Sequence, residues 1–578
     1  MREPERGPGA GTVAAPRTDI ERVGGRGAQR PGVAAYLCER HPLRLGPVCV
    51  VVASVLAAAG LAAVGMQGEI FLGDEPVHFR TAGRFAQTWH REPWDPLTAM
   101  PDRFDPLVLN GTPLWHAGLG LVWRLVGSES QAAAQAYQAG FYLLLLVSVY
   151  FGVRPVWGEA AASWAWLTAA SMPMVCVYGI LLYQDMPGAA LSALALLLVW
   201  RRQFFWSGVC LAAAYFTKMN MIGFVPWAAA LAAWLSEGPW HRRLRAAALV
   251  CLPAAATFAY DVAWRWEVYG GQMLEPLEDL GSLPPAVREV LGSRPQGFVY
   301  WKPYPFYDPK SVVSHLGVLG LLGAGAALLR ARDRASLWLW GCLVLAVAGF
   351  YLVFVRMGSP QMRFLFPAVL ALIVLGGVGL RNLCLPRWLL GLGLLGCAVQ
   401  AVVPPLYLDR LRHVPAAERE AFEWIRQHTP PRQRIMYPER SLLVHADRSP
   451  MWTGLNPAFF MSEATDAQRL ATLEFFKVSH VAIPLRRTYD RKVEGPHHGG
   501  YAIDFVEKAR SLPYLEKVYE NPGFLVFRVT HDPPPTAPGA ASCPAAPPAP
   551  AAHARRAARI RGAACFTLNL PGALLRVI

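Results

Sequence analysis

The sequence predicts a polytopic α-helical membrane protein with about eleven transmembrane helices and a small C-terminal external α/β domain. Three observations carry this prediction. Apolar residues gather in blocks that approach the ~20 residues needed to span a bilayer core. Only 16% of the residues are charged, against roughly a quarter in soluble domains, and the mean hydropathy is +0.26. The basic residues form short clusters between apolar blocks, which is typical of topology signals.

The predicted spans alternate with short connections and a few longer external segments. They lie near 47–67, 132–152, 159–180, 186–200, 203–218, 221–236, 246–264, 312–329, 336–355, 364–380 and 388–405. With these spans, the arginine clusters all fall on one side, which the positive-inside rule assigns to the cytoplasm. The clusters are those of the N-terminal arm and Arg154, Arg201, Arg202, Arg242, Arg243, Arg245, Arg330, Arg332, Arg334, Arg381 and Arg387. Because the number of predicted spans is odd, we expect a multi-pass protein of the cell (inner) membrane whose N-terminus is cytoplasmic and whose C-terminal domain is extracytoplasmic.

The spans divide the chain into four regions. Residues 1–46 are rich in Gly, Pro and Arg, so we expect a disordered cytoplasmic arm. The stretch is too long to be the charged first part of a secretory signal peptide. Residues 47–406 form the transmembrane domain, with large external loops near 68–130 and 266–311. Residues 407–530 form the external α/β domain, in which Leu515–Tyr519 and Phe524–Val529 flank a hairpin turn at Asn521-Pro-Gly523. Residues 531–578 are rich in Pro, Ala and Arg and are expected to be disordered.

Composition also argues against nucleic-acid binding, a disulfide framework and a cysteine-based metal site. The formal net charge of +15 does not indicate nucleic-acid binding, because the basic clusters lie where topology signals are expected. Of the ten cysteines, five lie within apolar runs and none lies between Leu408 and Val529. There is no CxxC spacing, so the sequence predicts neither a disulfide framework nor a cysteine-based metal site.

Two adjacent acids, Asp74 and Glu75, stand just past the first span, in a stretch that also contains His78. A carboxylate at the membrane surface can act as a general base that removes a proton from an acceptor hydroxyl. Partial burial suits that role, because it raises the pKa of a carboxyl group. The alternative is a solvated pair of loop carboxylates, which is common at helix boundaries.

A further acid, Asp185, lies in a tight turn between two predicted spans, on the same external side as Asp74. A charge beside hydrocarbon is costly, so an acid at this place is a functional candidate. The alternative is N-capping of the following helix, which an Asp with Pro187 shortly after it would suit.

Three cations, Lys218, Arg356 and Arg363, are expected on the same external side. Arginines there run against the positive-inside bias, and binding a phosphate would explain them. The alternatives are a lysine that snorkels to the interface and arginines that pair with Asp74 or Asp185. Together, acids and cations on one membrane surface suit a reaction with an anionic leaving group and a proton to remove.

Over roughly residues 47–529 the sequence resembles the GT-C fold membrane glycosyltransferases, in the branch of the protein O-mannosyltransferases and the lipid A aminoarabinose transferases (GT39/GT83-like). The resemblance rests on Asp74-Glu75, on Thr112–Gly127, on Gln184-Asp185-Met186-Pro187, on Thr217-Lys218 and on Arg363-Phe-Leu-Phe-Pro367. Two departures are that Met219 stands where the family has Gly and Gln184 where it has Thr.

The resemblance implies an inverting transfer of a sugar from a polyprenyl-phosphate donor to a hydroxyl of a lipid, glycan or protein acceptor. Asp74 would be the catalytic base supported by Glu75, and Asp185 would orient acceptor or donor. The implied substrate-binding residues are His78, Lys218, Arg356 and Arg363. Lys218 and the two arginines would hold the lipid phosphate. No cofactor or tightly bound metal is needed for a monophosphate leaving group, although the nearby acids are compatible with a divalent cation.

Two rival functions remain at this point. A membrane transporter also places charges among its helices, but here the charges lie at outer turns rather than at the midplane. A catalytically degenerate scaffold of the same fold is the other, and the intact Asp74, Asp185 and Lys218 argue against it.

Aromatic residues in the external loops are further candidates for sugar binding. Trp89, Trp94, Trp115 and the stretch 300–307 could stack on sugar rings, or could be ordinary residues of the aromatic belt at the membrane interface. His497 and His498 lie in a glycine-bearing loop and are interpreted as surface residues rather than metal ligands.

Overall fold

The computed structural model describes residues 43–70, 74–89, 113–269, 284–292, 309–330, 334–350, 365–381, 394–403, 406, 412–431, 433–437, 441–451, 464–485 and 503–530. All of these belong to one compact unit of residues 43–578. Several predicted features lie outside the described residues: the N-terminal arm up to residue 42, the tail 531–578, the aromatic stretch 300–307, Arg356 and Arg363, and His497 and His498.

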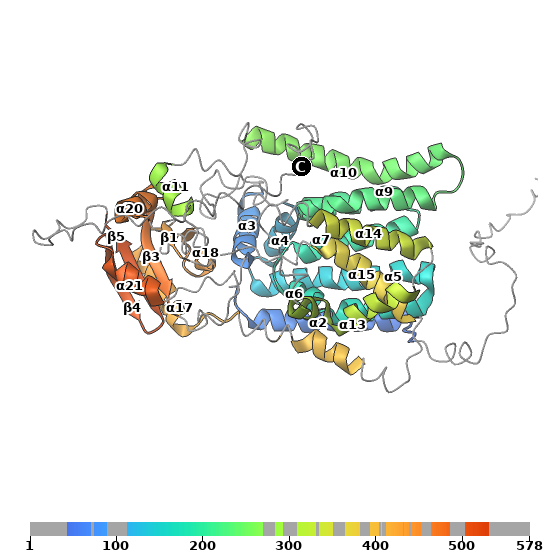
Figure 1. Cartoon of the computed structure of the whole chain (residues 1–578), viewed down its shortest axis with the longest axis horizontal. Coiled ribbons are helices and arrows are strands. Elements are labelled where there is room, and N and C mark those ends of the chain that lie inside the picture. Colours follow the sequence, from blue (N-terminus) through green and yellow to red (C-terminus); the bar gives the residue numbers. More distant parts are fainter. Residues whose placement is uncertain are drawn as a thin grey trace, which may run out of the picture. The chain divides into compact units, whose positions relative to one another are not determined.

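Apolar helices account for most of the described residues between Pro47 and Val403. They are α2 (Pro47–Gln67), α5 (Gln131–Ser171), α6 (Pro173–Ile180), α7 (Asp185–Trp200), α8 (Phe204–Thr217), the short 3₁₀ helix η2 (Met219–Gly223), α9 (Phe224–Leu235), α10 (Trp240–Tyr269), α13 (Pro309–Arg330), α14 (Arg334–Phe350), α15 (Phe366–Arg381) and a helical stretch at 394–403. Helices α5, α7, α9, α14 and α15 run side by side (Figure 1). Each predicted span thus has a helical counterpart, although the predicted span 159–180 is divided between the end of α5, which is broken at Gly158, and α6.

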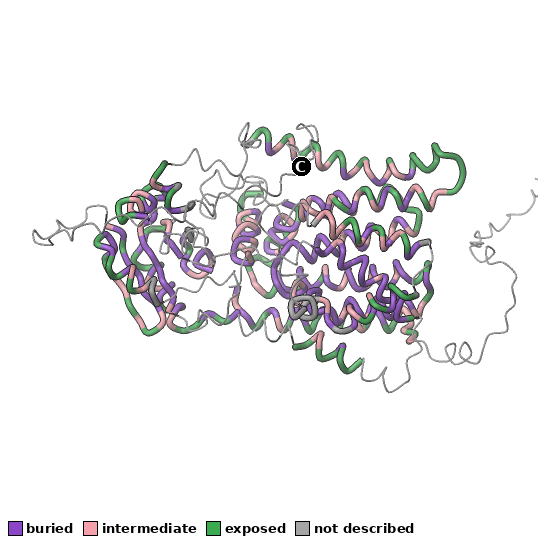
Figure 2. The backbone as a smooth tube through the Cα atoms, viewed as in Figure 1, coloured by how far each residue is buried: buried purple, intermediate pink, exposed green. Residues whose placement is uncertain are grey.

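Three described helices, α2, α5 and α10, are each long and apolar enough to cross a membrane, and the bent pair α6–α7 raises this number to as many as four. Other apolar helical stretches in the described part are shorter, at 10–17 residues, and in α13, which is kinked at Gly317, the apolar stretch is Leu319–Leu329. Helices α2 and α10 carry large apolar side chains that are exposed, including Val52, Leu56 and Leu252, and much of α10 is exposed (Figure 2). An apolar surface of this kind suits contact with lipid. The number of spans stays a prediction.

Small residues let the central helices approach closely. A Cβ added at Gly377 of α15 would lie 2.6 Å from the carbonyl oxygen of Ala161 in α5. One added at Gly323 of α13 would lie 2.7 Å from the Cα of Gly376. Helices inside a membrane gain little from the hydrophobic effect, so this close packing is what holds them together.

The chain bends sharply, by 117°, between α6 and α7. The side chain of Gln138 in α5 stabilises the bend, because its amide nitrogen lies within hydrogen-bonding distance of the carbonyls of Tyr178, Leu181 and Tyr183, at 2.9, 2.8 and 3.1 Å. These contacts satisfy backbone groups that the break would otherwise leave without partners. The bend brings Asp185, at the start of α7, into the interior, where it is 1% exposed.

Two helices lie between α2 and α5 in the chain, α3 (Glu75–Thr88) and α4 (Leu114–Val126), and they pack on each other. Phe79 of α3 meets Trp123 of α4 edge to face, with ring centroids 4.7 Å apart. Gly120 allows the close approach, since a Cβ there would lie 2.9 Å from the backbone nitrogen of Ala86. The apolar positions of α4 that are buried, including Trp115, recur at helical spacing.

A five-stranded mixed sheet in the order β2-β1-β3-β5-β4 forms the C-terminal part of the described chain. Its strands are β1 (Arg434–Met436), β2 (Ser449–Met451), β3 (Val478–Pro484), β4 (Leu515–Asn521) and β5 (Phe524–Val529). β1 is parallel to both β2 and β3, whereas β5 is antiparallel to β3 and β4. The hairpin between β4 and β5 turns where the sequence predicts, and the Asn521 side chain accepts a hydrogen bond from Gly523 N–H (3.0 Å).

Helices α17 (Ala416–His428), α18 (Leu442–His445), α20 (Asp466–Phe475) and α21 (Ile503–Ser511) accompany the sheet. A capping box of Thr465 and Gln468 begins α20. Helix α11 (Pro285–Gly292), from the segment between α10 and α13, also belongs here. Its Val287 and Val290 are fully buried in the same apolar cluster as strand residues of β3 and β5.

Candidate active site

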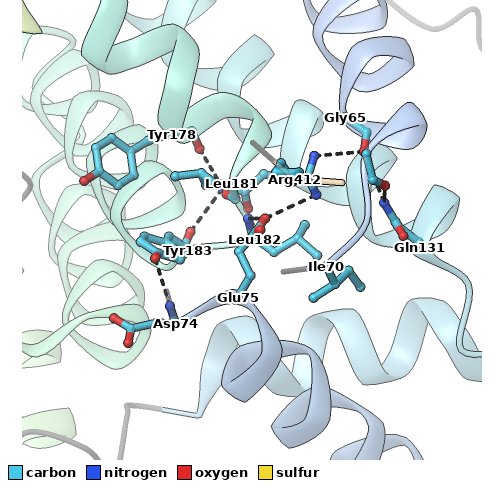
Figure 3. A network of polar contacts seen from close by, with 12 residues as sticks. Gly65, Ile70, Asp74, Glu75, Gln131, Tyr178, Leu181, Leu182, Tyr183 and Arg412 are labelled. Atoms are coloured by element: carbon cyan, nitrogen blue, oxygen red, sulfur yellow. Dashed lines mark hydrogen bonds and ion pairs between the residues drawn. The ribbon is translucent and has the colours of Figure 1, made fainter. Parts of the chain in front are cut away.

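The adjacent acids Asp74 and Glu75 begin α3 and point apart (Figure 3). Asp74 is half-buried, and its N–H donates to the Tyr183 hydroxyl oxygen at 2.9 Å. Glu75 is fully buried. Its Oε1 accepts from the Leu182 N–H at 3.0 Å and lies 3.3 Å from Arg412 Nη2. The alternative of a solvated carboxylate pair is therefore wrong for Glu75.

Asp185 and Lys218, which the sequence places in separate turns, form an ion pair between the side chains. The Asp185 side chain is 2% exposed and that of Lys218 is 14% exposed. Lys218 follows the last residue of α8 and has an extended backbone, which lets its side chain turn inward. An ammonium group held inside by a carboxylate is not snorkelling, so that alternative is wrong. The start of α7 has no side-chain capping hydrogen bond, and the Asp185 carboxylate serves Lys218 instead.

Two histidines connect α3 with α7. His78 Nδ1 lies 3.0 Å from His116 Nε2, and His116 Nδ1 lies 3.4 Å from the Gln184 side-chain nitrogen. His116 is 4% exposed, and burial together with the neighbouring His78 holds its pKa well below the ordinary value of a histidine. The predicted His78 thus belongs to a chain of polar side chains that leads to Gln184, the residue before Asp185. Sequence reasoning missed His116, because its helix brings it to His78 through a tertiary contact.

A further buried ion pair lies on α10, where Arg265 Nε donates to Asp261 Oδ2 at 2.9 Å. The Tyr215 hydroxyl of α8 donates to the same oxygen at 2.7 Å. The side chains of both ions are at most 3% exposed. Tyr215 is near Lys218 at the end of α8, so this cluster lies toward the same end of the helices. The sequence carried a signal for it, an acid and an arginine four residues apart in an apolar helix.

An open pocket of about 430 Å³ lies beside this end of α8. It is lined by Phe85, Trp89, Pro113, Leu114, Ala117, Phe216, Tyr260 and Trp264. Trp89, a predicted sugar-stacking residue, is therefore at a cavity, with Arg124 positioned 4.5 Å from its ring. Trp115 is not available for stacking, because it is 1% exposed and donates to Gln138 (3.2 Å), which corrects the expectation for that residue. Trp94 lies outside the described residues.

The structure describes only part of the predicted site. The structure brings together Asp74, Glu75, His78, Asp185 and Lys218 through Tyr183, Gln184 and Leu182. Arg356 and Arg363 lie outside the described residues. Within the described part of the chain, no group of three or more His, Cys, Asp or Glu side chains is arranged to hold a metal ion.

No protein-family model matches the chain, and no curated protein matches its sequence. Solved structures do match its fold. The oligosaccharyltransferase AglB from Archaeoglobus fulgidus, in complex with an inhibitory peptide and a dolichol-phosphate, superposes with a TM-score of 0.52 at 15% identity, over 84% of this chain and 74% of AglB. ArnT from Cupriavidus metallidurans, in the apo state, gives a TM-score of 0.53 at 15% identity, over 82% of this chain and 97% of ArnT.

The arabinofuranosyltransferase AftD from mycobacteria is a third similar structure. It has a TM-score of 0.50 at 15% identity, over 85% of this chain and 42% of AftD. Similarity at these identities establishes the fold, which is the one that the sequence motifs predict. The chain is a helical membrane protein with the GT-C fold of membrane glycosyltransferases.

Proposed function

We propose that the protein is a membrane glycosyltransferase that moves a sugar from a polyprenyl-phosphate donor to an acceptor hydroxyl, with inversion, on the extracytoplasmic face of the cell membrane. The observation that carries the proposal is the buried Asp185–Lys218 ion pair next to the half-buried Asp74, in a GT-C fold. Keeping both ions at the end of membrane helices is costly, so their position suits a charged substrate.

In the proposed reaction, the Asp74 carboxylate accepts the proton of the acceptor hydroxyl. The acceptor oxygen then bonds to the anomeric carbon on the face opposite the phosphate. The bond from the anomeric carbon to the phosphate oxygen breaks, and its electron pair leaves with the polyprenyl phosphate. Inversion follows from attack on the opposite face.

Lys218 stabilises the negative charge that develops on the leaving phosphate, together with Arg356 and Arg363. Its ion pair with Asp185 fixes the position of the ammonium group before the substrate arrives, which is what electrostatic catalysis requires. Asp185 in turn orients the sugar, and His78 contributes a polar contact. AglB has been solved with a dolichol-phosphate, which supports a lipid phosphate as the leaving group.

The aromatic pocket next to α8 is the proposed site for the acceptor. Its rings come from α3, α8 and α10, and Phe216 is two residues from Lys218. Trp and Tyr rings combine an apolar face with a polar edge, which suits the C–H face and hydroxyl rim of a sugar. The acceptor would therefore be a glycan or glycolipid, presented at the membrane surface.

The test is transfer by the purified protein in lipid vesicles from a panel of radiolabelled polyprenyl-phosphate sugars, with protein-free vesicles as control. The expected result is transfer from at least one donor, with the product's anomeric configuration by NMR opposite to that of the donor. The same assay in EDTA is expected to show unchanged turnover, because no divalent ion is required. Retained configuration would contradict inversion. Absence of transfer from every donor would favour the transporter or scaffold alternatives.

A further inference from the structure

Arg412 is a fully buried arginine that reaches the site from the segment ahead of α17. Both its side chain and that of Glu75 are 0% exposed. One terminal nitrogen, Nη1, donates to the Gly65 carbonyl at 3.0 Å, and Nη2 lies 3.3 Å from Glu75 Oε1. A buried ion pair is costly to form, but removing one partner costs more, because it leaves an uncompensated charge. The burial of the Glu75 side chain therefore depends on Arg412.

Glu75 in turn joins the two catalytic acids. Its Oε1 accepts the Leu182 N–H at 3.0 Å, and Leu182 lies in the bend that ends at Asp185. On the other side of the same bend, the Tyr183 hydroxyl accepts the Asp74 N–H at 2.9 Å. Figure 3 shows Glu75 and Arg412 pointing toward each other while the Asp74 carboxylate points away. One buried carboxylate thus fixes the start of α3 against the start of α7.

An exposed pair lies nearby, between Glu69, which precedes α3, and Arg419 of α17. Glu69 receives a hydrogen bond from Val414 N–H (2.6 Å) and forms an ion pair with Arg419 (2.5 Å). The Arg419 side chain is 63% exposed, whereas that of Arg412 is buried. Exposed pairs contribute little to stability, so Arg419 is a natural control for Arg412.

We propose that Arg412 is a positioning residue for glycosyl transfer: by neutralising Glu75, it holds Asp74 and Asp185 in the register that the reaction needs. Arg412 acts through Glu75 and does not touch the substrate. Its catalytic consequence rests on the proposed function, whereas the structural coupling does not. Glu75 accordingly holds the site in place rather than moving a proton.

The test is a double-mutant cycle of Arg412→Met, Glu75→Gln and the double variant, with Arg419→Met as control. Each single variant should lower kcat by about 100-fold while the donor KM stays within about twofold, because misplacing a catalytic group by ~1 Å has effects of this size. The double variant should recover to within about tenfold of wild type, since it buries no unpaired charge. Arg412→Lys should lie between wild type and Arg412→Met.

The proposal would be overturned by a wild-type kcat in Arg412→Met. It would also be overturned if the kcat of the double variant did not exceed that of the less active single variant. Amide hydrogen exchange of the peptide covering 178–185 provides a readout that does not depend on activity. Exchange should accelerate in Arg412→Met and Glu75→Gln, recover in the double variant and stay unchanged in Arg419→Met. If the wild type transferred no sugar, the proposed function would fail, and this exchange pattern would still test the coupling. Wild-type protection in Arg412→Met would refute it.

Discussion

Two ion pairs at one end of the helices are buried, whereas the ion pair between Arg528 and Glu516 on the C-terminal sheet is exposed. The pairs Asp185–Lys218 and Asp261–Arg265 have side chains that are at most 14% exposed, whereas Arg202 and Glu237, at the opposite end of the helices, are 54% and 84% exposed. On the sheet, the Arg528 and Glu516 side chains are 55% and 52% exposed. Surface pairs favour solubility and contribute little energy, whereas buried ions cost free energy that the fold must offset. Buried charges of this kind are functional candidates, and the proposed function assigns Asp185 and Lys218 a role in the reaction.

The largest effect is expected from breaking the pair at the site. Lys218→Met should lower kcat by about 1,000-fold, because it removes a preorganised cation from the leaving phosphate. It should also lower the melting temperature, because Asp185 is left buried without this partner. The control is Lys517→Met, which removes a half-exposed lysine of the sheet. Both kcat and thermal unfolding should be measured, and a wild-type kcat in Lys218→Met would contradict a catalytic role for the pair.

A smaller effect is expected at the aromatic pocket. Trp264→Ala should raise the KM for a glycan acceptor by about tenfold, because a stacking surface worth a few kcal/mol or less is lost. The donor KM and kcat should stay near wild type. Trp206→Ala is the matched control, since Trp206 is 58% exposed and does not line the pocket. Equal acceptor KM values in both variants would remove the pocket from acceptor binding.

The sheet should show a modest dependence of stability on pH. Burial and, secondarily, Arg528 lower the pKa of His480 from 6.5 to about 4. The unfolded chain therefore takes up a proton at a pH where the folded sheet resists it. The stability that this histidine contributes is complete above pH 6.5 and is lost as the pH falls toward 4. Melting temperatures of wild type and His480→Gln between these values should diverge, with the steeper loss in wild type, and parallel curves would contradict the assignment.

The smallest effect is expected from the exposed pair on the sheet. Arg528→Met should change the free energy of unfolding by less than about 1 kcal/mol, because solvent screens the interaction with Glu516. Turnover should be that of wild type. Chemical denaturation measures the stability of this variant and the transfer assay measures its turnover. A loss of turnover would contradict the claim that the exposed pair on the sheet has no part in the reaction.

The local features of the fold were predictable from the sequence. Apolar runs predict the helices, and Asn521-Pro-Gly523 predicts the hairpin, because both depend on residues close together in the chain. The alternation of arginine clusters also placed Asp74, Asp185 and Lys218 on one side, and the structure brings them together. The motifs predict the GT-C fold, which the similar structures confirm.

Features that depend on tertiary contacts could not be predicted. Nothing in the sequence links Arg412 with Glu75, because the pair forms only when the segment before α17 packs against the start of α3. The burial of Trp115 likewise depends on tertiary contacts, among them its hydrogen bond to Gln138 of α5. The contact of α11 with the sheet is of the same kind, since its short amphipathic pattern does not say which apolar surface it will cover.

The central claim is that a carboxylate at the start of α3 removes the acceptor proton, and kcat for Asp74→Asn tests it most directly. The variant should lose at least about 100-fold in turnover, the size expected for a general base, while donor binding is retained. Asp466→Asn, which changes an exposed acid of the C-terminal region, should match wild type. Equal turnover in Asp74→Asn and wild type would contradict the account.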